Sequence, residues 1–168
     1  AALDGDGDLD LVAGNLGLNS MIQAQPDAPA RLYVGDLDGD GSTESLLTTV
    51  RDGGEYPYAS LDQLRSQFTV LRREYPDFTS YGAREVSALF GPGAMANAEV
   101  LEAATFASVW AENDGTGRFT IHELPVEAQF APAFAVRPGD FDEDGLTDVM
   151  LAGNFTGVRP DRGQEAAG

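Results

Sequence analysis

The feature that most constrains the fold is a nine-residue acidic pattern that the chain repeats three times. The three segments cover residues 2–10, 36–44 and 140–148. Each carries acidic side chains at positions 1, 3, 5 and 9 and glycine at position 6, except that Ala2 stands at position 1 of the first segment. Without a cation, carboxylates gathered on so short a loop repel one another strongly. The pattern therefore predicts three cation-binding turns.

Calcium is the cation that fits this pattern, because it takes six to eight oxygen ligands at about 2.3–2.6 Å. Alternate carboxylates on a tightly curled backbone can point into one centre, and the carbonyl of position 7 is a natural further ligand. The predicted metal ligands are Asp4, Asp6, Asp8, Asp10, Asp36, Asp38, Asp40, Ser42, Glu44, Asp140, Asp142, Asp144, Leu146 and Asp148. We expect two or three Ca²⁺ ions, since Ala2 and Glu44 depart from the pattern in the first two loops.

The alternative is that these segments are solvated acidic turns of a salt-adapted protein. The three loops hold 13 of the 28 acidic residues, and such clustering favours cation sites over a uniformly acidic surface.

The EF-hand opens with a similar acidic pattern but requires a glutamate at position 12 and a helix on each side. Position 12 is Ala13, Leu47 and Leu151 in the three loops, and β-like apolar segments follow each of them. The loops are therefore not EF-hands, and we expect each loop to run directly into a strand, as in a β-hairpin.

A second motif occupies residues 113–119, with glycine at positions 115 and 117. It indicates a hairpin turn between strands at residues 105–110 and 119–124. Together, the acidic loops and this turn resemble FG-GAP/VCBS repeats, the units of integrin-type β-propellers. The segment 153–160 and a helical insert further resemble a bacterial branch of these proteins related to the cartilage acidic protein group.

This resemblance implies a mainly β fold: a partial β-propeller of about three blades, with Asp-rich calcium loops and a small α-helical insert. Residues 1–168 would then be one segment of a larger propeller, because closed propellers typically have four to eight blades. The resemblance also implies a secreted, extracellular or periplasmic location. Open blade edges would leave strands unpaired and would permit self-association.

The insert follows from the spacing of the loops, which start 34 and then 104 residues apart. A propeller blade takes about 40–60 residues, so the longer interval holds a blade and an insert at about residues 59–98. Ser60 and Gln63 form a capping box there, and Pro76 should end the helix that follows. The apolar stripe of this helix is Leu61, Leu64, Phe68 and Leu71. Two or three short helices are expected, either as a cap that contacts a partner or as a packed decoration.

The composition excludes several partners. The net charge is −18, and all ten basic residues are arginine, so nucleic acid and anionic membrane surfaces are poor partners. Cysteine is absent, which excludes disulfides and thiolate metal sites. No apolar run reaches the 18 residues that indicate membrane insertion.

We therefore expect a calcium-binding scaffold of an exported protein that recognises a protein or a glycan, for example in adhesion. The alternative is a segment of a polysaccharide-active or other propeller enzyme, because fold does not determine function. No catalytic constellation is visible: His122 is the only histidine, and no Gly-x-Ser-x-Gly elbow is present.

Overall fold

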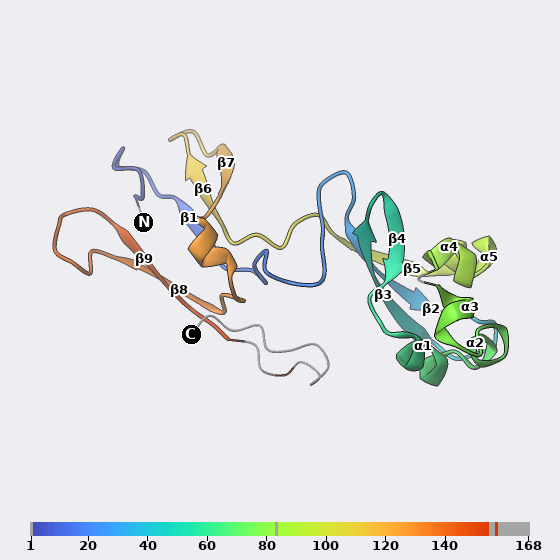
Figure 1. The fold of residues 1–168 in the computed structure, drawn as a ribbon. Coiled ribbons are helices and arrows are strands. Elements are labelled where there is room, and N and C mark those ends of the chain that lie inside the picture. The colour runs from blue at the N-terminus through green and yellow to red at the C-terminus, as the bar shows by residue number, and fades with distance from the viewer. Residues whose placement is uncertain (1, 83, 155–156, 158–168) are drawn as a thin grey trace. The chain divides into compact units, whose positions relative to one another are not determined.

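The computed structural model describes residues 2–82, 84–154 and 157, and these form two compact units (Figure 1). Unit 1 combines Ala1–Met21 with Phe106–Gly168, and unit 2 is Ile22–Thr105. The fold is mainly β, with antiparallel sheets in both units, as the sequence predicts. No described helix is long and apolar enough to cross a membrane.

Unit 2 contains a four-stranded antiparallel sheet in the order β4-β3-β2-β5. Its strands are β2 (Ala30–Gly35), β3 (Glu44–Arg51), β4 (Gly54–Pro57) and β5 (Glu99–Ala103). The first three follow one another as hairpins, whereas β5 returns after the helices to lie beside β2. The register places Ala30 opposite Ala103, so the chain enters and leaves this sheet at neighbouring positions.

The predicted helical insert is present between β4 and β5, although it is more finely divided than expected. The described helices are α1 (Leu61–Gln67), α2 (Thr69–Glu74), α3 (Phe78–Tyr81), α4 (Val86–Leu89) and α5 (Pro92–Asn97). The capping box is confirmed, because the Gln63 side chain accepts a hydrogen bond from the Ser60 backbone at 2.8 Å.

The expectation of one continuous helix up to Pro76 is wrong. Phe68 adopts an extended backbone, with φ −109° and ψ 104°, and separates α1 from α2. Its side chain is fully buried and meets the Phe90 ring edge-on, with 4.7 Å between the ring centroids. Helical periodicity alone cannot reveal such a break, because the break is favoured by Phe90, a packing partner 22 residues away.

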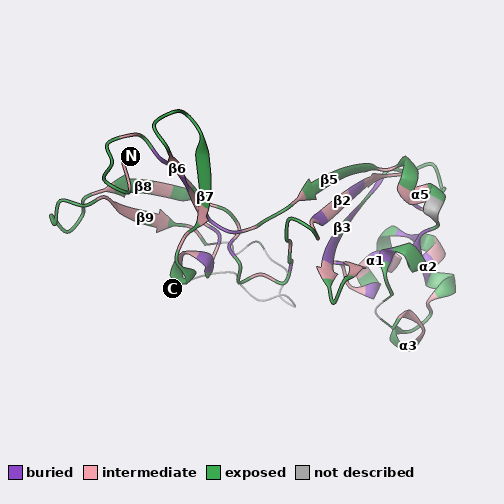
Figure 2. Cartoon of the chain, turned by 90° about the horizontal axis from the view of Figure 1, so that it is seen from above, coloured by how far each residue is buried: buried purple, intermediate pink, exposed green. Residues whose placement is uncertain are grey.

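Unit 2 has a hydrophobic core between its sheet and its helices. Buried side chains of the sheet meet three residues of the predicted apolar stripe, all but Leu61, and further residues in and directly after α4. The cluster consists of Tyr33, Leu37, Leu46, Leu64, Phe68, Leu71, Val86, Leu89 and Phe90. Figure 2 shows this buried material in β2, β3 and the neighbouring helices.

Unit 1 contains two small antiparallel sheets and a 3₁₀ helix. The elements are β1 (Leu11–Ala13), β6 (Val109–Asn113), β7 (Phe119–Glu123), η1 (Val126–Gln129), β8 (Ala135–Gly139) and β9 (Asp148–Ala152). One sheet has the order β1-β6-β7, and the other pairs β8 with β9. The predicted hairpin turn is confirmed, because Asn113 pairs with Phe119 across β6 and β7. Its first strand, however, covers Val109–Asn113 rather than residues 105–110.

Close backbone approaches hold parts of unit 1 together. A Cβ atom on Gly153 would lie 2.1 Å from the carbonyl oxygen of Pro132, and one on Gly14 would lie 2.3 Å from that of Ala133. The Ala133 backbone also donates a hydrogen bond to the Asn15 carbonyl at 2.8 Å. Glycine at these two positions therefore permits close packing of the chain.

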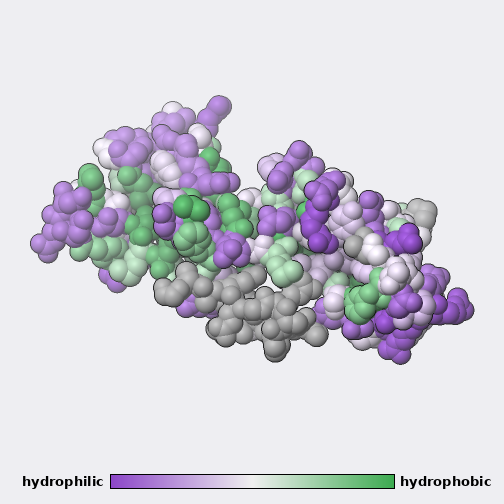
Figure 3. All heavy atoms as spheres, in the orientation of Figure 1, coloured by the Kyte–Doolittle hydropathy of each residue, from purple (hydrophilic) through white to green (hydrophobic). Residues whose placement is uncertain are grey.

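Large apolar side chains of unit 1 remain on its surface. In the three-stranded sheet, Leu11, Ala111 and Ile121 stand opposite one another, and Leu11 and Ile121 are 58% and 63% exposed. Figure 3 shows hydrophobic atoms gathered on the visible face of unit 1.

Candidate metal centres

Two of the three acidic loops are hairpin connections. Residues 36–43 join β2 to β3, and residues 140–147 join β8 to β9. Gly35 pairs with Glu44, and Gly139 with Asp148, so position 9 of each loop is the first residue of the second strand. The first loop leads into β1. The expectation that the loops run directly into strands is confirmed.

The carboxylates hold all three loops in one repeated pattern of hydrogen bonds. The side chain at position 3 accepts a bond from the backbone N–H of position 5, position 5 accepts from position 7, and position 9 accepts from position 2. These bonds measure 2.7 to 3.3 Å, and their acceptors are Asp4, Asp6 and Asp10, then Asp38, Asp40 and Glu44, then Asp142, Asp144 and Asp148. The loops therefore share one conformation as well as one sequence pattern.

A fourth bond distinguishes the first loop from the others. Asp36 and Asp140, at position 1, each accept a hydrogen bond from the glycine at position 6 at 3.0 Å. Ala2 has no carboxylate and cannot make this bond. The substitution noted in the sequence therefore removes both a candidate ligand and one bond of the turn.

The tight turn requires a left-handed backbone at two positions. Position 6 is glycine in every loop, with φ between 86° and 98°. Position 4 is also left-handed, and it is glycine in the first two loops but Glu143 in the third, with φ 64°. A side chain there is strained, because left-handed conformations cost about 1–2 kcal/mol for a residue with a Cβ atom.

Two loops bring three carboxylates close enough to hold one ion. In each of two groups, one carboxylate oxygen per residue lies within 4.8 Å of those of the other members. The groups are Asp36, Asp38 and Asp40 in the second loop and Asp140, Asp142 and Asp148 in the third. Glu44, Asp144 and the acids of the first loop belong to no such group among the described residues.

The donor set fits a hard cation. All six grouped side chains offer carboxylate oxygens, which suit Ca²⁺ and Mg²⁺ rather than the softer metals that prefer nitrogen or sulfur. The two groups could therefore hold a metal ion and are compatible with calcium binding. The contributions of the Ser42 and Leu146 carbonyls remain predictions.

The first loop is tied to the 113–119 turn instead. Asp10 is only 3% exposed, and its carboxylate accepts hydrogen bonds from the backbones of Leu3 at 2.7 Å and Asn113 at 2.9 Å. These bonds lower the pKa of Asp10. Sequence reasoning missed this connection, because the two turns are about a hundred residues apart and neither motif signals the other.

The Oδ1 atom of Asp8, in the first loop, is buried and has no hydrogen-bond partner among the described residues. Burial raises the pKa of this carboxyl, and the neighbouring charge of Asp6 raises it further. This oxygen could serve a cation, but the described acids of the first loop do not converge in a group of three.

His122 lies on β7, as the sequence predicts, and has two neighbours. Its ring stacks on Trp110 with 4.7 Å between centroids, and its Nε2 atom lies 2.8 Å from a carboxylate oxygen of Glu112. All three side chains belong to the β6–β7 hairpin. These contacts pack the three side chains together on the hairpin.

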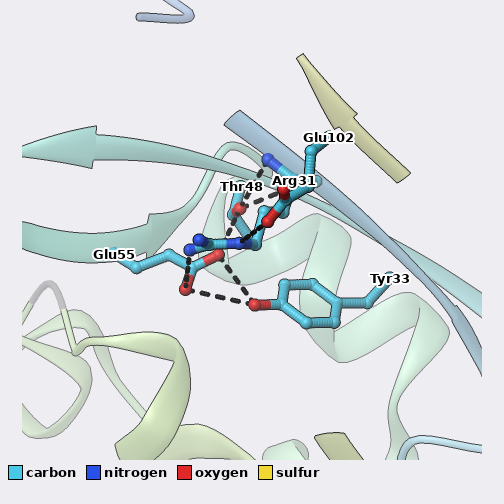
Figure 4. A network of polar contacts seen from close by, with 5 residues as sticks. All are labelled: Arg31, Tyr33, Thr48, Glu55 and Glu102. Atoms are coloured by element: carbon cyan, nitrogen blue, oxygen red, sulfur yellow. Dashed lines mark hydrogen bonds and ion pairs between the residues drawn. The ribbon is translucent and has the colours of Figure 1, made fainter. Parts of the chain in front are cut away.

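A polar network crosses the four-stranded sheet of unit 2 (Figure 4). Arg31 on β2 donates from Nε to Glu102 at 2.8 Å and from Nη1 to Glu55 at 3.3 Å. Glu55 also accepts bonds from the hydroxyls of Thr48 at 2.7 Å and Tyr33 at 3.1 Å.

The network raises the pKa of two of its members. Both shifts favour the protonated forms, which donate the hydrogen bonds of the network. The hydrogen bond to Glu102 raises the pKa of Arg31, and burial together with the charge of Glu55 raises that of Tyr33. Because its members come from β2, β3, β4 and β5, the network links all four strands and is best explained as structural.

Comparisons of the chain with protein-family models, with curated proteins and with solved structures found no match.

Proposed function

We propose that this chain is a calcium-binding β-propeller segment of the FG-GAP/VCBS kind, from an exported protein that recognises a protein or glycan ligand. The observation that carries the proposal is the pair of converging aspartate groups, Asp36 with Asp38 and Asp40, and Asp140 with Asp142 and Asp148. Both lie on strand-connecting loops with the same hydrogen-bond pattern. The four-stranded antiparallel sheet of unit 2 has the strand count of a propeller blade, which gives further support.

The proposed role of the metal is structural. A bound Ca²⁺ would neutralise the clustered carboxylates and fix the hairpin that begins the next strand. The acidic side chains at positions 1, 3, 5 and 9 would hold the ion, while their hydrogen bonds to the loop backbone keep the side chains oriented toward it. No step of a reaction is required of these residues, which agrees with a binding scaffold rather than an enzyme.

The test is a calorimetric titration of chelator-stripped protein with CaCl₂, followed by thermal melting with and without the metal. We expect two or three sites and a large rise in melting temperature, because a ligand at one hundred times its Kd stabilises the folded state by about 2.7 kcal/mol. Unchanged melting after chelation would contradict the proposal.

Two variants and a salt control sharpen this test. Asp142→Asn should remove the site of the third loop, whereas Glu143→Gln changes an acid of the same loop that belongs to neither group and should preserve it. If NaCl at matched ionic strength stabilised the protein as much as CaCl₂, the loops would be solvated turns of a salt-adapted protein.

A further inference from the structure

A groove runs along β9 in unit 1. Two pockets, of about 410 Å³ and about 530 Å³, share Glu127, Ala128 and Leu151 in their walls and are therefore neighbours along one groove. No residue of β8 lines either of them. The groove thus lies between β9 and the segment around η1.

Residues 147–149 and 151–154 form the β9 wall of the groove, and Met150 does not line it. The wall therefore includes consecutive residues of the strand and not one alternating set of side chains. In a strand paired with β9, residues two apart would point to the same side, about 6.6–6.8 Å from one another. Alternate side chains of such a partner could then face the two pockets.

The opposite wall is fixed in place. Gln129, at the end of η1, is 3% exposed, and its amide nitrogen donates to the carbonyls of Ser108 at 2.8 Å and Leu124 at 3.0 Å. Its amide oxygen accepts from the Ser108 backbone at 2.8 Å. Because these bonds satisfy a buried side chain, the wall formed by Pro125 and Ala128 is preformed rather than assembled on binding.

Within the described part of the chain, β9 pairs with β8 and with no other strand, so its second edge is open there. An open edge presents backbone N–H and C=O groups that can pair with another strand. Addition of an extended peptide to such an edge derives its affinity from main-chain hydrogen bonds and its specificity from pockets for alternate side chains.

Charge indicates the chemistry of the occupant. Glu127 is exposed and lines both pockets. Unit 1 as a whole contains 15 acidic and 4 basic residues, so an acidic partner would be repelled and a basic one attracted. A second copy of this acidic chain is correspondingly disfavoured as the occupant.

We propose that the groove between β9 and η1 binds an extended segment of another polypeptide, which adds to the β9 edge as a strand. The segment is apolar at alternate positions, which occupy the two pockets, and carries a basic residue opposite Glu127. The groove reaches the end of the third acidic loop at Thr147 and Asp148, and its other wall residues lie outside the acidic loops.

The test uses the full chain and three labelled nine-residue peptides with valine at alternate positions, measured by fluorescence anisotropy. The first has arginine at intervening positions, the second has glutamate there, and the third is the arginine peptide with a central proline. We expect saturable binding of the first, at least about ten-fold weaker binding of the second, and none of the third, because proline removes a ladder hydrogen bond. Equal binding of all three would overturn the proposal.

Matched variants locate the binding. Ala128→Trp fills the groove and should weaken the arginine peptide by about ten-fold or more, whereas Met150→Trp lies on the other face of β9 and should leave binding unchanged. Glu127→Lys should weaken binding of the arginine peptide about three-fold, and Glu123→Lys, outside the groove, should leave it unchanged.

The other possible outcomes identify a different binding site or a different occupant. Binding that survives both Ala128→Trp and Glu127→Lys would place the peptide elsewhere and overturn the proposal. A dimer in sedimentation that Ala128→Trp abolishes and Met150→Trp preserves would make a second copy the occupant. Melting curves of each variant would show that the fold is retained, and Glu127→Lys, which alters an exposed side chain, keeps the test valid if Ala128→Trp fails to fold.

Discussion

Unit 2 and unit 1 have similar amounts of strand but bury their apolar side chains very differently. Unit 2 encloses nine buried residues in one cluster, including Phe68 at 0% exposure. In unit 1, the buried positions include the small or polar residues Ala107, Ser108, Ala111 and Gln129. Its exposed large apolar residues are Leu9, Leu11, Leu18, Met21, Phe119, Ile121, Val126, Phe130, Phe134, Phe141, Leu146 and Met150.

The difference shows what the helical insert contributes to the fold. A sheet that is apolar on one face needs a second layer against which to bury it. In unit 2, α1, α2 and α4 provide that layer with side chains at helical spacing. Unit 1 relies instead on close backbone approaches at Gly14 and Gly153 and on the hydrogen bonds of Gln129. Side-chain truncation should therefore damage unit 2, and backbone crowding should damage unit 1.

The largest expected effect comes from a pair of phenylalanine truncations. Phe68→Ala should lower the free energy of unfolding of unit 2 by about 3–5 kcal/mol, because it leaves a cavity in the core. Phe134→Ala, at a side chain that is 69% exposed in unit 1, should change it by no more than about 0.5 kcal/mol. Denaturant titrations of both variants measure the difference, and equal losses would mean that the two units share one kind of core.

The next largest effect is a loss of stability in unit 1 rather than in unit 2. Gly153→Ala places a methyl group against the Pro132 carbonyl and should destabilise unit 1 by about 1–3 kcal/mol. Gly93→Ala in α5 of unit 2 meets no atom within 4 Å and should be neutral or stabilising by up to about 1 kcal/mol. Amide hydrogen exchange, read separately for each unit, checks both. A tolerated Gly153→Ala would contradict the importance of backbone packing in unit 1.

A smaller effect concerns the strained position of the third loop. Glu143→Gly should stabilise unit 1 by up to about 1 kcal/mol, since relief of the left-handed side chain exceeds the added backbone entropy. Glu127→Gly, at a position without a left-handed backbone, should instead lose about 0.5–1 kcal/mol. Thermal melting in chelator isolates this effect from metal binding, and a loss in both variants would argue against strain at Glu143.

The smallest expected effect is common to the two units. The backbone N–H of Ser80 lowers the pKa of Asp77 in unit 2, and the hydroxyl and backbone of Thr116 lower that of Asp114 in unit 1. A lowered folded-state pKa stabilises the fold above the ordinary value of 3.8, and this contribution disappears as the pH falls through the folded-state pKa.

Asp77→Asn and Asp114→Asn should therefore melt slightly below the parent at pH 5, and the gap should narrow as the pH falls below 3.8. Melting temperatures measured from pH 5 downward check the expectation. A gap that does not change with pH would show that the charge of the carboxylate is not its source.

Local patterns predicted much of this fold. The capping box at Ser60, the stripe that ends at Leu71, the hairpin around residues 113–119 and the glycine at position 6 of each acidic loop all lie where expected. Each of these depends on residues within a few positions of one another. The periodicity of a helix and the conformational demand of a tight turn are therefore readable without knowledge of the rest of the chain.

Contacts between distant residues could not be predicted in this way. The break at Phe68 depends on Phe90, the hydrogen bond from Asn113 to Asp10 joins two separate turns, and the buried Gln129 looks like an ordinary polar residue in the sequence. The candidate ligands were identifiable from their spacing. Which three of them converge depends on side-chain rotamers, and these are not determined by the spacing alone.

The pairing of Ala30 with Ala103 has a consequence for the order in which the chain folds. Strand β1 must find β6 almost a hundred residues later, and closing such a loop is entropically unfavourable and slow. Once β2 and β5 have paired, the open loop between β1 and β6 shrinks to roughly two dozen residues, which reduces the entropic barrier by about 1 kcal/mol. Unit 2 is one continuous stretch of the chain and should therefore fold first. Its folding should bring the two sequence segments of unit 1 close together.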